Sequence, residues 1–495
     1  MIYTSTRNAG IQVTSAYAIT KGLSDEGGLF VPSEIPDISQ DEIAALGSMS
    51  YSERAFAILK KFLTDFTDDE LMEAVKSAYD SGFAVPDTVQ IAQLYPDCYI
   101  LELFHGPTCA FKDMALQLLP HLMTISAKKC ENMQGNKIAV LCATSGDTGK
   151  AALEGFRDVA GTSVTVFYPE DGVSDMQKRQ MVTQEGGNVH VCAVKGNFDD
   201  CQTGVKEIFG DKELNGYLAG KSMVLSSANS INWGRLAPQI VYYISAYASL
   251  LAEGEIEAGE EINVCVPTGN FGNILAAYYA KAMGLPLNKL ICASNSNNIL
   301  TDFITTGVYD RNRDFHTTMS PSMDILISSN LERLEYHYHL GSNCKDLSGW
   351  HKKLNEQGCY EVNDLVKTKI AKDFYGNWCS EADTAAAIRN VFDKYGYLMD
   401  THTAVAFRVY EKYRKETGDQ TKTIIASTAS PYKFCSAVYQ AFGNAPDADE
   451  FITARRLEEL TNTVMPEPLI KTQSLPVRFR DSVETSEMIN IIKSL

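Results

Sequence analysis

One lysine stands among small, aromatic and apolar residues in the stretch LFHGPTCAFKDMAL, residues 103–116. Burial between Phe104, Phe111 and aliphatic neighbours would disfavour the ammonium form of Lys112 and leave a nucleophilic amine. Such an amine can form an imine with a carbonyl compound. The alternative is a surface lysine at the start of a helix over KDMALQLLPHLM, where the aspartate that follows it could help to cap the first turn.

Two turns rich in hydrogen-bond donors could hold anions. TGNFGN, residues 268–273, follows a buried strand pattern and precedes a helix, so its backbone N–H groups and the helix dipole would converge on one point. Gly269 and Gly272 would permit close backbone approach and positive φ, and the two asparagines tolerate left-handed geometry. TSGDTG, residues 144–149, has the same setting with three hydroxyls and one carboxylate. Either stretch alone could be an ordinary tight turn, but two at one sheet edge define a ligand crevice.

A repeated pattern would position these turns. From about residue 90 to 440 a short β-branched run, a turn and a helix follow one another, most clearly over 137–156, 262–284 and 423–442. Such alternation predicts a mostly parallel α/β sheet. Upstream, residues 52–80 predict two helices, the second with a capping box of Thr67 and Glu70.

The charge balance argues against a nucleic-acid partner. Lys and Arg number 44 against 62 Asp and Glu, a formal net charge of -18, so the average surface would repel a phosphate backbone. An anionic small substrate would need a local cluster of basic groups and helix N-termini inside a pocket.

The chain is expected to be a soluble, cytoplasmic protein with no membrane partner. No secretory signal is visible, and the longest nearly apolar run, residues 240–252, is too short to span a membrane. The 12 cysteines contain no C-x-x-C pair and are expected to be reduced, with Cys109 a wall residue rather than a nucleophile. His337 and His339 would share a face on a strand, but no third ligand accompanies them, and no metal site is expected.

The lysine segment FHGPTCAFKD resembles a motif of threonine synthases, which are pyridoxal-phosphate enzymes of the tryptophan-synthase-type fold, fold type II. Other segments resemble the family in the same order over almost the whole chain. They are GLSDEGGLFVP (22–32), ATSGDTGKAA (143–152), KGNFDDCQ (195–202), SANSINWGR (227–235), PTGNFGN (267–273), DTHTAVAF (400–407) and STASPYKF (427–434).

The resemblance implies an α/β fold of type II with two mostly parallel-sheet subdomains and a helical N-terminal module. We expect a largely helical N-terminal domain over residues 1–90, which would end near the proline-containing stretch AVPDTVQ. A cofactor-binding catalytic core would cover residues 91–445. A helical C-terminal extension, residues 446–495, would pack on that core.

The resemblance also implies the cofactor and the residues that bind it. Lys112 would hold pyridoxal phosphate as a Schiff base and later move protons between substrate carbons. The cofactor's phosphate would lie on the TGNFGN turn, and the Thr428 hydroxyl would meet the pyridine nitrogen. The cofactor-binding set is Lys112, Gly269, Asn270, Phe271, Gly272, Asn273 and Thr428.

The implied substrate site lies in two further segments. Thr144, Ser145, Asp147 and Thr148 match the loop around the substrate's amino-acid carboxylate. Many fold type II relatives carry asparagine where Asp147 stands, so the role of this carboxylate is open between an orienting group and a helix cap. Arg235, with Asn229 nearby, is the candidate for the substrate's phosphate, because a guanidinium suits phosphate oxygens; a structural salt bridge is the alternative.

The reaction implied is that of a pyridoxal-phosphate dependent carbon-oxygen lyase in threonine biosynthesis. It converts O-phospho-L-homoserine and water to L-threonine and phosphate by γ-elimination followed by β-addition of water. A phospho-lyase or a serine/threonine dehydratase on the same fold is an alternative, and a non-catalytic anion-binding protein is another. Either a monomer or a homodimer is compatible with the sequence.

Overall fold

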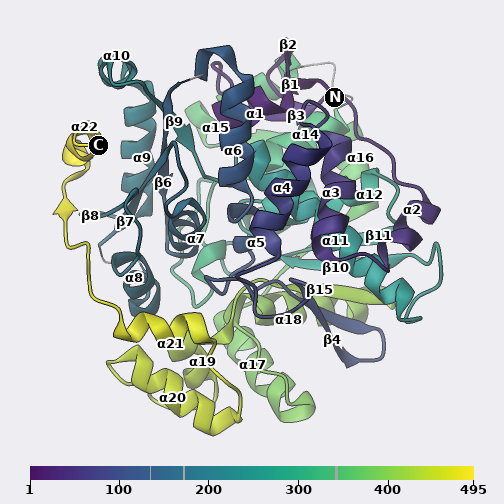
Figure 1. The fold of residues 1–495 in the computed structure, drawn as a ribbon. Helices are drawn as coiled ribbons and strands as arrows, with labels where there is room; N and C mark the ends of the chain where they lie inside the picture. Colours follow the sequence, from purple (N-terminus) through teal and green to yellow (C-terminus); the bar gives the residue numbers. More distant parts are fainter. Residues whose placement is uncertain (134, 171–172, 340–343) are drawn as a thin grey trace.

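Two mainly parallel sheets form the centre of the molecule in this computed structural model, which describes residues 1–133, 135–170, 173–339 and 344–495 (Figure 1). Neighbouring strands are parallel in both sheets except for the edge pair β4 (Gln90–Tyr95) and β5 (Cys98–Glu102). In order, the five-stranded sheet is β16 (Ser482–Val483), β8 (Val189–Val194), β7 (Thr162–Pro169), β6 (Lys137–Ala143) and β9 (Met223–Ser227). The six-stranded sheet is β14 (Phe374–Trp378), β11 (Leu287–Ser294), β10 (Ile262–Pro267), β15 (Thr423–Ser427), β5 (Cys98–Glu102) and β4 (Gln90–Tyr95).

Helices cover both faces of the five-stranded sheet, which explains why its strands read as continuous apolar runs. Along β6, Ile138 and Val140 belong to the apolar core that also contains α7. The residue between them, Ala139, belongs to the core formed with α9 on the opposite face. A parallel strand buried on both sides needs apolar residues at every position. The helices of this subdomain are α7 (Asp147–Phe156), α8 (Asp175–Val182), α9 (Phe198–Gly210) and α10 (Lys212–Gly220).

The six-stranded sheet is also covered on both faces. In β10, Val264 and Val266 pack in the core shared with α11 and α12, whereas Cys265 between them packs in the core shared with α18. The helices of this part are α11 (Trp233–Ala252), α12 (Gly272–Ala282), α13 (Ile299–Thr306), α14 (Leu331–Tyr338), α15 (Cys344–Gln357), α16 (Asp364–Asp373), α17 (Glu381–Tyr395), α18 (Thr401–Thr417) and α19 (Cys435–Ala441). A small antiparallel pair, β12 (Val308–Asp310) and β13 (Cys359–Glu361), lies beside α13 and α15.

The N-terminal segment is helical apart from one antiparallel sheet that the sequence patterns did not predict. Its strands are β2 (Asn8–Val13), β1 (Tyr3–Ser5) and β3 (Phe30–Pro32). Its helices are α1 (Ser15–Lys21), α2 (Gln40–Leu46), α3 (Tyr51–Phe62) and α4 (Asp68–Tyr79). The two helices predicted over 52–80 are α3 and α4, and the capping box of Thr67 and Glu70 is present at the start of α4.

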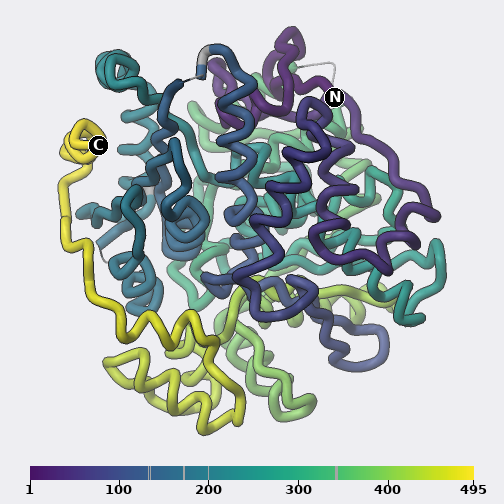
Figure 2. The backbone as a smooth tube through the Cα atoms, viewed as in Figure 1, coloured from purple at the N-terminus to yellow at the C-terminus, as the bar shows by residue number. Residues whose placement is uncertain are grey.

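The C-terminal segment reaches both sheets. Helices α20 (Glu450–Thr461) and α21 (Glu467–Ser474) contact α19 and α8 respectively. The chain then runs along the side of the molecule to β16, which pairs with β8, and to α22 (Met488–Lys493), which packs on α9 (Figure 2).

The single helix expected from KDMALQLLPHLM is in fact two helices, α5 (Asp113–Leu116) and α6 (Leu119–Lys129). Pro120 has no N–H group to donate to the carbonyl of Leu116, so the helix is interrupted between them. That carbonyl instead lies against Gly155 of α7, where an added Cβ would stand 1.9 Å from the Leu116 oxygen. This close approach packs α5, the helix that follows Lys112, against α7, which lies on the five-stranded sheet.

We therefore expect Gly155→Ala to destabilise the protein, because the new methyl group meets a backbone carbonyl rather than a mobile side chain. Overpacking of this kind costs about 1–3 kcal/mol. Thermal unfolding measures it as a lower Tm. The matched control is Gly216→Ala, a helical glycine with nothing within 4 Å of its added Cβ, which should raise the Tm slightly. An equal Tm change for both variants would contradict the packing argument.

Within the described ranges, no helix is long and apolar enough to cross a membrane. All 12 cysteines are free thiols, and most of them are buried. His337 lies on α14 rather than on a strand, where its ring nitrogen bonds the Tyr279 hydroxyl, and His339 pairs with Asp346. The described residues contain no cluster of His, Cys, Asp or Glu that could hold a metal ion.

Candidate active site

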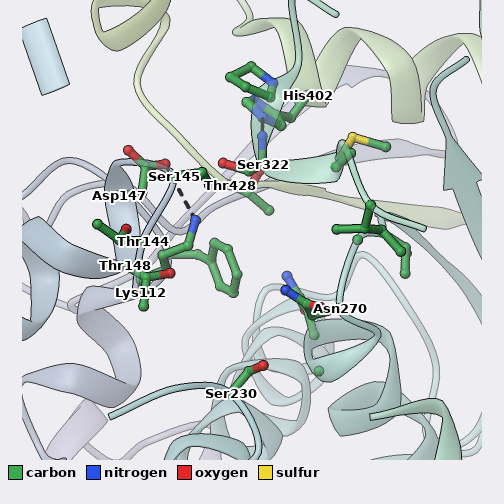
Figure 3. A pocket seen from close by; sticks show the side chains of 18 of the residues that line it. Lys112, Thr144, Ser145, Asp147, Thr148, Ser230, Asn270, Ser322, His402 and Thr428 are labelled. Atoms are coloured by element: carbon green, nitrogen blue, oxygen red, sulfur yellow. Dashed lines mark hydrogen bonds and ion pairs between the residues drawn. The ribbon is translucent and has the colours of Figure 1, made fainter. Parts of the chain in front are cut away.

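A cavity lies between the two subdomains, where several parallel strands end. Its wall includes the turn after β6, the turn after β10 and the residues that follow β15. The expectation that the two donor-rich turns share one sheet edge is wrong, because β6 and β10 belong to different sheets whose strand ends meet at the cavity. All of the residues predicted to bind the cofactor or the substrate line this cavity: Lys112, Thr144, Ser145, Asp147, Thr148, Asn229, Arg235, Gly269, Asn270, Phe271, Gly272, Asn273 and Thr428. In Figure 3, Lys112 and the TSGDTG side chains lie on one side of the cavity and Asn270 lies on the other.

Lys112 is largely buried, so the alternative of a surface lysine is wrong. Its side chain is 11% exposed, and Nζ lies 4.9 Å from the centre of the Phe111 ring. Burial lowers the pKa of Lys112, and the nearby cations Lys433 and Arg235 lower it further, although Asp147 acts in the opposite direction. The Lys112 amine is therefore biased towards its neutral, nucleophilic form.

The loop that precedes Lys112 is held in place by Asp113, the residue that follows the lysine. Asp113 is fully buried and accepts hydrogen bonds from Thr108 N at 2.9 Å and Thr108 Oγ1 at 2.6 Å. The Phe111 N–H donates to the carbonyl of Thr428 at 2.8 Å, which ties the lysine to the end of β15. Asp113 thus fixes the preceding loop and is not a solvent-exposed helix cap.

Three residues near Lys112 in the sequence play different parts. Phe111 lines the cavity, whereas Phe104 is not among its lining residues in the described chain and instead packs against the His105 ring. Cys109 is buried, and this burial raises its pKa to about 12. A thiol with such a pKa is protonated at neutral pH, which agrees with a wall residue.

The TGNFGN turn has the geometry of an anion cradle, but its strained residue is not the one expected. Phe271, not either glycine, has positive φ, at 62°. Gly269 is needed for close approach, since an added Cβ would stand 2.6 Å from the Ser322 carbonyl oxygen. Helix α12 begins at Gly272, and its first two residues line the cavity, where the N–H groups of a first helical turn have no partner within the helix. The turn therefore offers backbone donors and a helix N-terminus to an anion.

Asn273 adds an unpaired donor to this cradle. Its Oδ1 accepts hydrogen bonds from the hydroxyls of Tyr242 and Tyr243, which fix the orientation of the amide. Its Nδ2 is buried and has no hydrogen-bond partner among the described residues. A buried donor without a partner is costly unless a ligand satisfies it.

One side chain of the TSGDTG turn stabilises the turn itself, and two others line the cavity. Thr144 Oγ1 accepts from the N–H groups of Gly146 at 2.9 Å and Gly149 at 2.8 Å, so this oxygen shapes the turn. Ser145 and Thr148 line the cavity, and their hydroxyls make no hydrogen bond to another described residue. Their hydroxyls are thus available to a ligand.

Arg235 has no carboxylate partner in the described chain, so the salt-bridge alternative is wrong. The residue is 3% exposed and lies in the first turn of α11. Its Nη1 donates to the carbonyl of Ala228, but its Nε has no partner among the described residues. Burial lowers the pKa of Arg235 to about 10, which still leaves the guanidinium charged at neutral pH. A buried cation without a counter-ion is suited to bind an anion.

The sequence reasoning missed residues that complete the site. Lys433 is fully buried and lies 2.8 Å from Asp147 Oδ1 through its Nζ. His402 lines the cavity; its Nδ1 bonds Asp400 and its Nε2 accepts from the Ser322 N–H at 3.2 Å. Lys433 could have been found, because PYKF places it between two aromatic residues and AFKD places Lys112 directly after one.

Three family models match the chain in order along its length. They describe the threonine synthase N terminus over residues 2–79, a pyridoxal-phosphate dependent enzyme over 90–342, and the threonine synthase C-terminal part over 403–491. Together they cover most of the sequence.

Individual proteins show the same similarity. The human protein threonine synthase-like 1 is 44% identical over 438 residues, or 86% of this chain, and the chain spans only 57% of that relative's length. Threonine synthase of Pseudomonas aeruginosa is 38% identical, with 96% of this chain and 97% of the relative covered. The solved structure of pyridoxal-phosphate-bound threonine synthase from Brucella melitensis superposes with a TM-score of 0.87 at 35% identity and covers 100% of this chain and 98% of its own.

Proposed function

The chain belongs to the threonine synthase family of pyridoxal-phosphate dependent enzymes, and from this membership we propose that it converts O-phospho-L-homoserine and water to L-threonine and phosphate. The fold type II architecture and the cofactor expected from the sequence are confirmed.

The cavity residues fit pyridoxal phosphate. The backbone of the TGNFGN turn and the unpaired Asn273 Nδ2 supply donors for its phosphate. Lys112 supplies a buried amine for its aldehyde, and Thr428 places a hydroxyl on the same wall. When bound, the cofactor supplies the electron sink that allows a C–H bond of an attached amino acid to ionise.

We assign Lys112 the proton transfers. Its amine is biased towards the neutral form and can act as a base at one substrate carbon and as an acid at the next. A flexible lysine side chain beside the reacting atoms can reach more than one carbon, as an elimination followed by water addition requires.

We assign Arg235 the substrate's phosphate. The observation that carries the proposal is that this buried guanidinium, without a carboxylate partner in the described chain, shares one cavity with Lys112. A substrate with an amino acid at one end and a phosphate at the other would satisfy both groups. Ser145 and Thr148 would hold its carboxylate, and Asn229 would help to orient it beside Arg235.

Product analysis tests the proposed function. Purified protein with O-phospho-L-homoserine is expected to release phosphate and accumulate threonine in equal amounts. A phospho-lyase would instead release ammonia and 2-oxobutyrate, and a serine/threonine dehydratase would act on the unphosphorylated amino acids. An anion-binding protein without catalysis would release no phosphate at all. Any of these three outcomes would contradict the proposal.

A further inference from the structure

The carboxylate of Asp147 lies between two lysines that come from different parts of the chain. Its Oδ1 is 2.8 Å from Lys433 Nζ and accepts a hydrogen bond from Gln177 Nε2 at 2.9 Å. Its Oδ2 is 3.4 Å from Lys112 Nζ, the contact drawn as a dashed line in Figure 3. Of the two lysines, Lys433 therefore makes the closer contact with the shared carboxylate.

Lys433 depends on Asp147 for its charge balance. It lies in the short turn Pro431–Phe434 and is 0% exposed. Besides Asp147, its ammonium donates to the carbonyl of Thr108 at 2.9 Å. A buried ammonium is strongly destabilising without a counter-ion, and Asp147 supplies one for Lys433. The ammonium of Lys433 and the amide of Gln177 both contact Oδ1 of Asp147, whereas its other oxygen, Oδ2, faces Lys112.

Lys112 therefore shares the Asp147 carboxylate with Lys433, which makes the closer contact. The charged groups that face Lys112 are Asp147 on α7, Lys433 beyond it, and Arg235 on α11. Near Lys433 lie two further titratable groups, Asp113 and the Cys109 thiol. Two ammonium groups and one guanidinium therefore surround a single interacting carboxylate, and Lys112 makes the longer of the two lysine contacts with it, which favours loss of the Lys112 proton.

We propose that Lys433 is a positioning residue that occupies Asp147 and thereby keeps Lys112 in its neutral, cofactor-reactive form. The inference rests on the proposed function, because it takes Lys112 as the reactive lysine. It also gives Asp147 a role that asparagine could not fill, since an amide at this position could not pair with Lys433.

The pH dependence of cofactor capture by the full-length chain tests this role. Capture joins the Lys112 nitrogen to the aldehyde carbon of added pyridoxal phosphate with loss of one water, and borohydride reduces the resulting C=N bond to a stable amine. Mass spectrometry of the Lys112 peptide then gives the capture rate at each pH. Only the neutral amine reacts, so the rate rises with pH around a midpoint.

Lys433→Met should move this midpoint upwards by roughly 1 unit or more, because Lys112 then gains Asp147 as its own counter-ion and loses a neighbouring cation. Lys433→Arg keeps the charge and should keep the wild-type midpoint. The double variant Lys433→Met with Asp147→Asn removes both charges, so its midpoint should return towards that of the wild type. The double variant can be compared with the wild type even if the single variant is unstable.

A merely structural lysine would change the Tm and the overall yield but not the midpoint. An unchanged midpoint in Lys433→Met would therefore overturn this inference and leave the proposed function standing. A double variant that keeps the raised midpoint of the single variant would also overturn it, because the effect would not pass through Asp147. If the wild-type protein carries its adduct on a lysine other than Lys112, the proposed function and this inference both fail.

Discussion

Replacing Lys112 by alanine is expected to lower kcat for threonine formation by roughly 10³-fold or more, since general acid–base catalysis by one group contributes about 10²–10⁴-fold and this lysine serves more than one proton transfer. The side chain also provides the covalent attachment for the cofactor, so cofactor retention should fall as well. Steady-state release of phosphate from O-phospho-L-homoserine, with threonine quantified in parallel, measures the loss.

The Lys112 variant should remain folded, which separates a catalytic from a structural effect. Asp147 keeps Lys433 as its ion-pair partner, so no buried charge is left uncompensated when Lys112 is removed. The control is Lys206→Ala, which changes an exposed lysine on α9 and should leave kcat unchanged. A Lys112→Ala protein with near wild-type turnover would show that another group moves the protons.

Replacing Arg235 by methionine is expected to lower kcat/KM for O-phospho-L-homoserine by roughly 10²-fold, because each charge-assisted hydrogen bond contributes about 1.5–3 kcal/mol and 1.4 kcal/mol corresponds to a factor of 10. The substrate's phosphate would lose its proposed charged partner. Inhibition by inorganic phosphate should weaken in parallel, which measures the same contact without turnover.

Two further variants make the Arg235 prediction specific. Arg235→Lys keeps the charge but loses the planar pair of donors, so its activity should lie between those of the wild type and Arg235→Met. Arg157→Gln changes an arginine whose side chain is 43% exposed at the end of α7, and it should behave like the wild type. Equal phosphate inhibition of wild type and Arg235→Met would place the substrate's phosphate elsewhere.

Local sequence patterns predicted the elements on which the site is built. The three strand-turn-helix segments over 137–156, 262–284 and 423–442 are confirmed as β6 with α7, β10 with α12, and β15 with α19. Each of these segments can be predicted from its local sequence alone. Continuous apolar runs predict strands buried on both faces, and glycine-rich turns mark where each strand ends. Lys112 could be singled out for the same reason, since its apolar neighbours are adjacent in sequence.

The rest of the site depends on contacts between residues far apart in the chain. Lys433 and Asp147 are 286 positions apart and become partners only when β15 and β6 end at the same cavity. The positive φ at Phe271 could not be predicted, because glycine is the usual residue for that conformation and two glycines stand in the same turn. Ser322 approaches Gly269 through a long loop without a periodic pattern, so its place at the site could not be predicted.

The covalent link between Lys112 and pyridoxal phosphate is the centre of the proposed function, and reduction of the holoenzyme with borohydride tests it most directly. After digestion, the peptide that contains Lys112 should carry the reduced cofactor, and the Lys112→Ala protein should carry none. An adduct on Lys433, the other buried lysine in contact with Asp147, or on no lysine at all, would contradict the assignment.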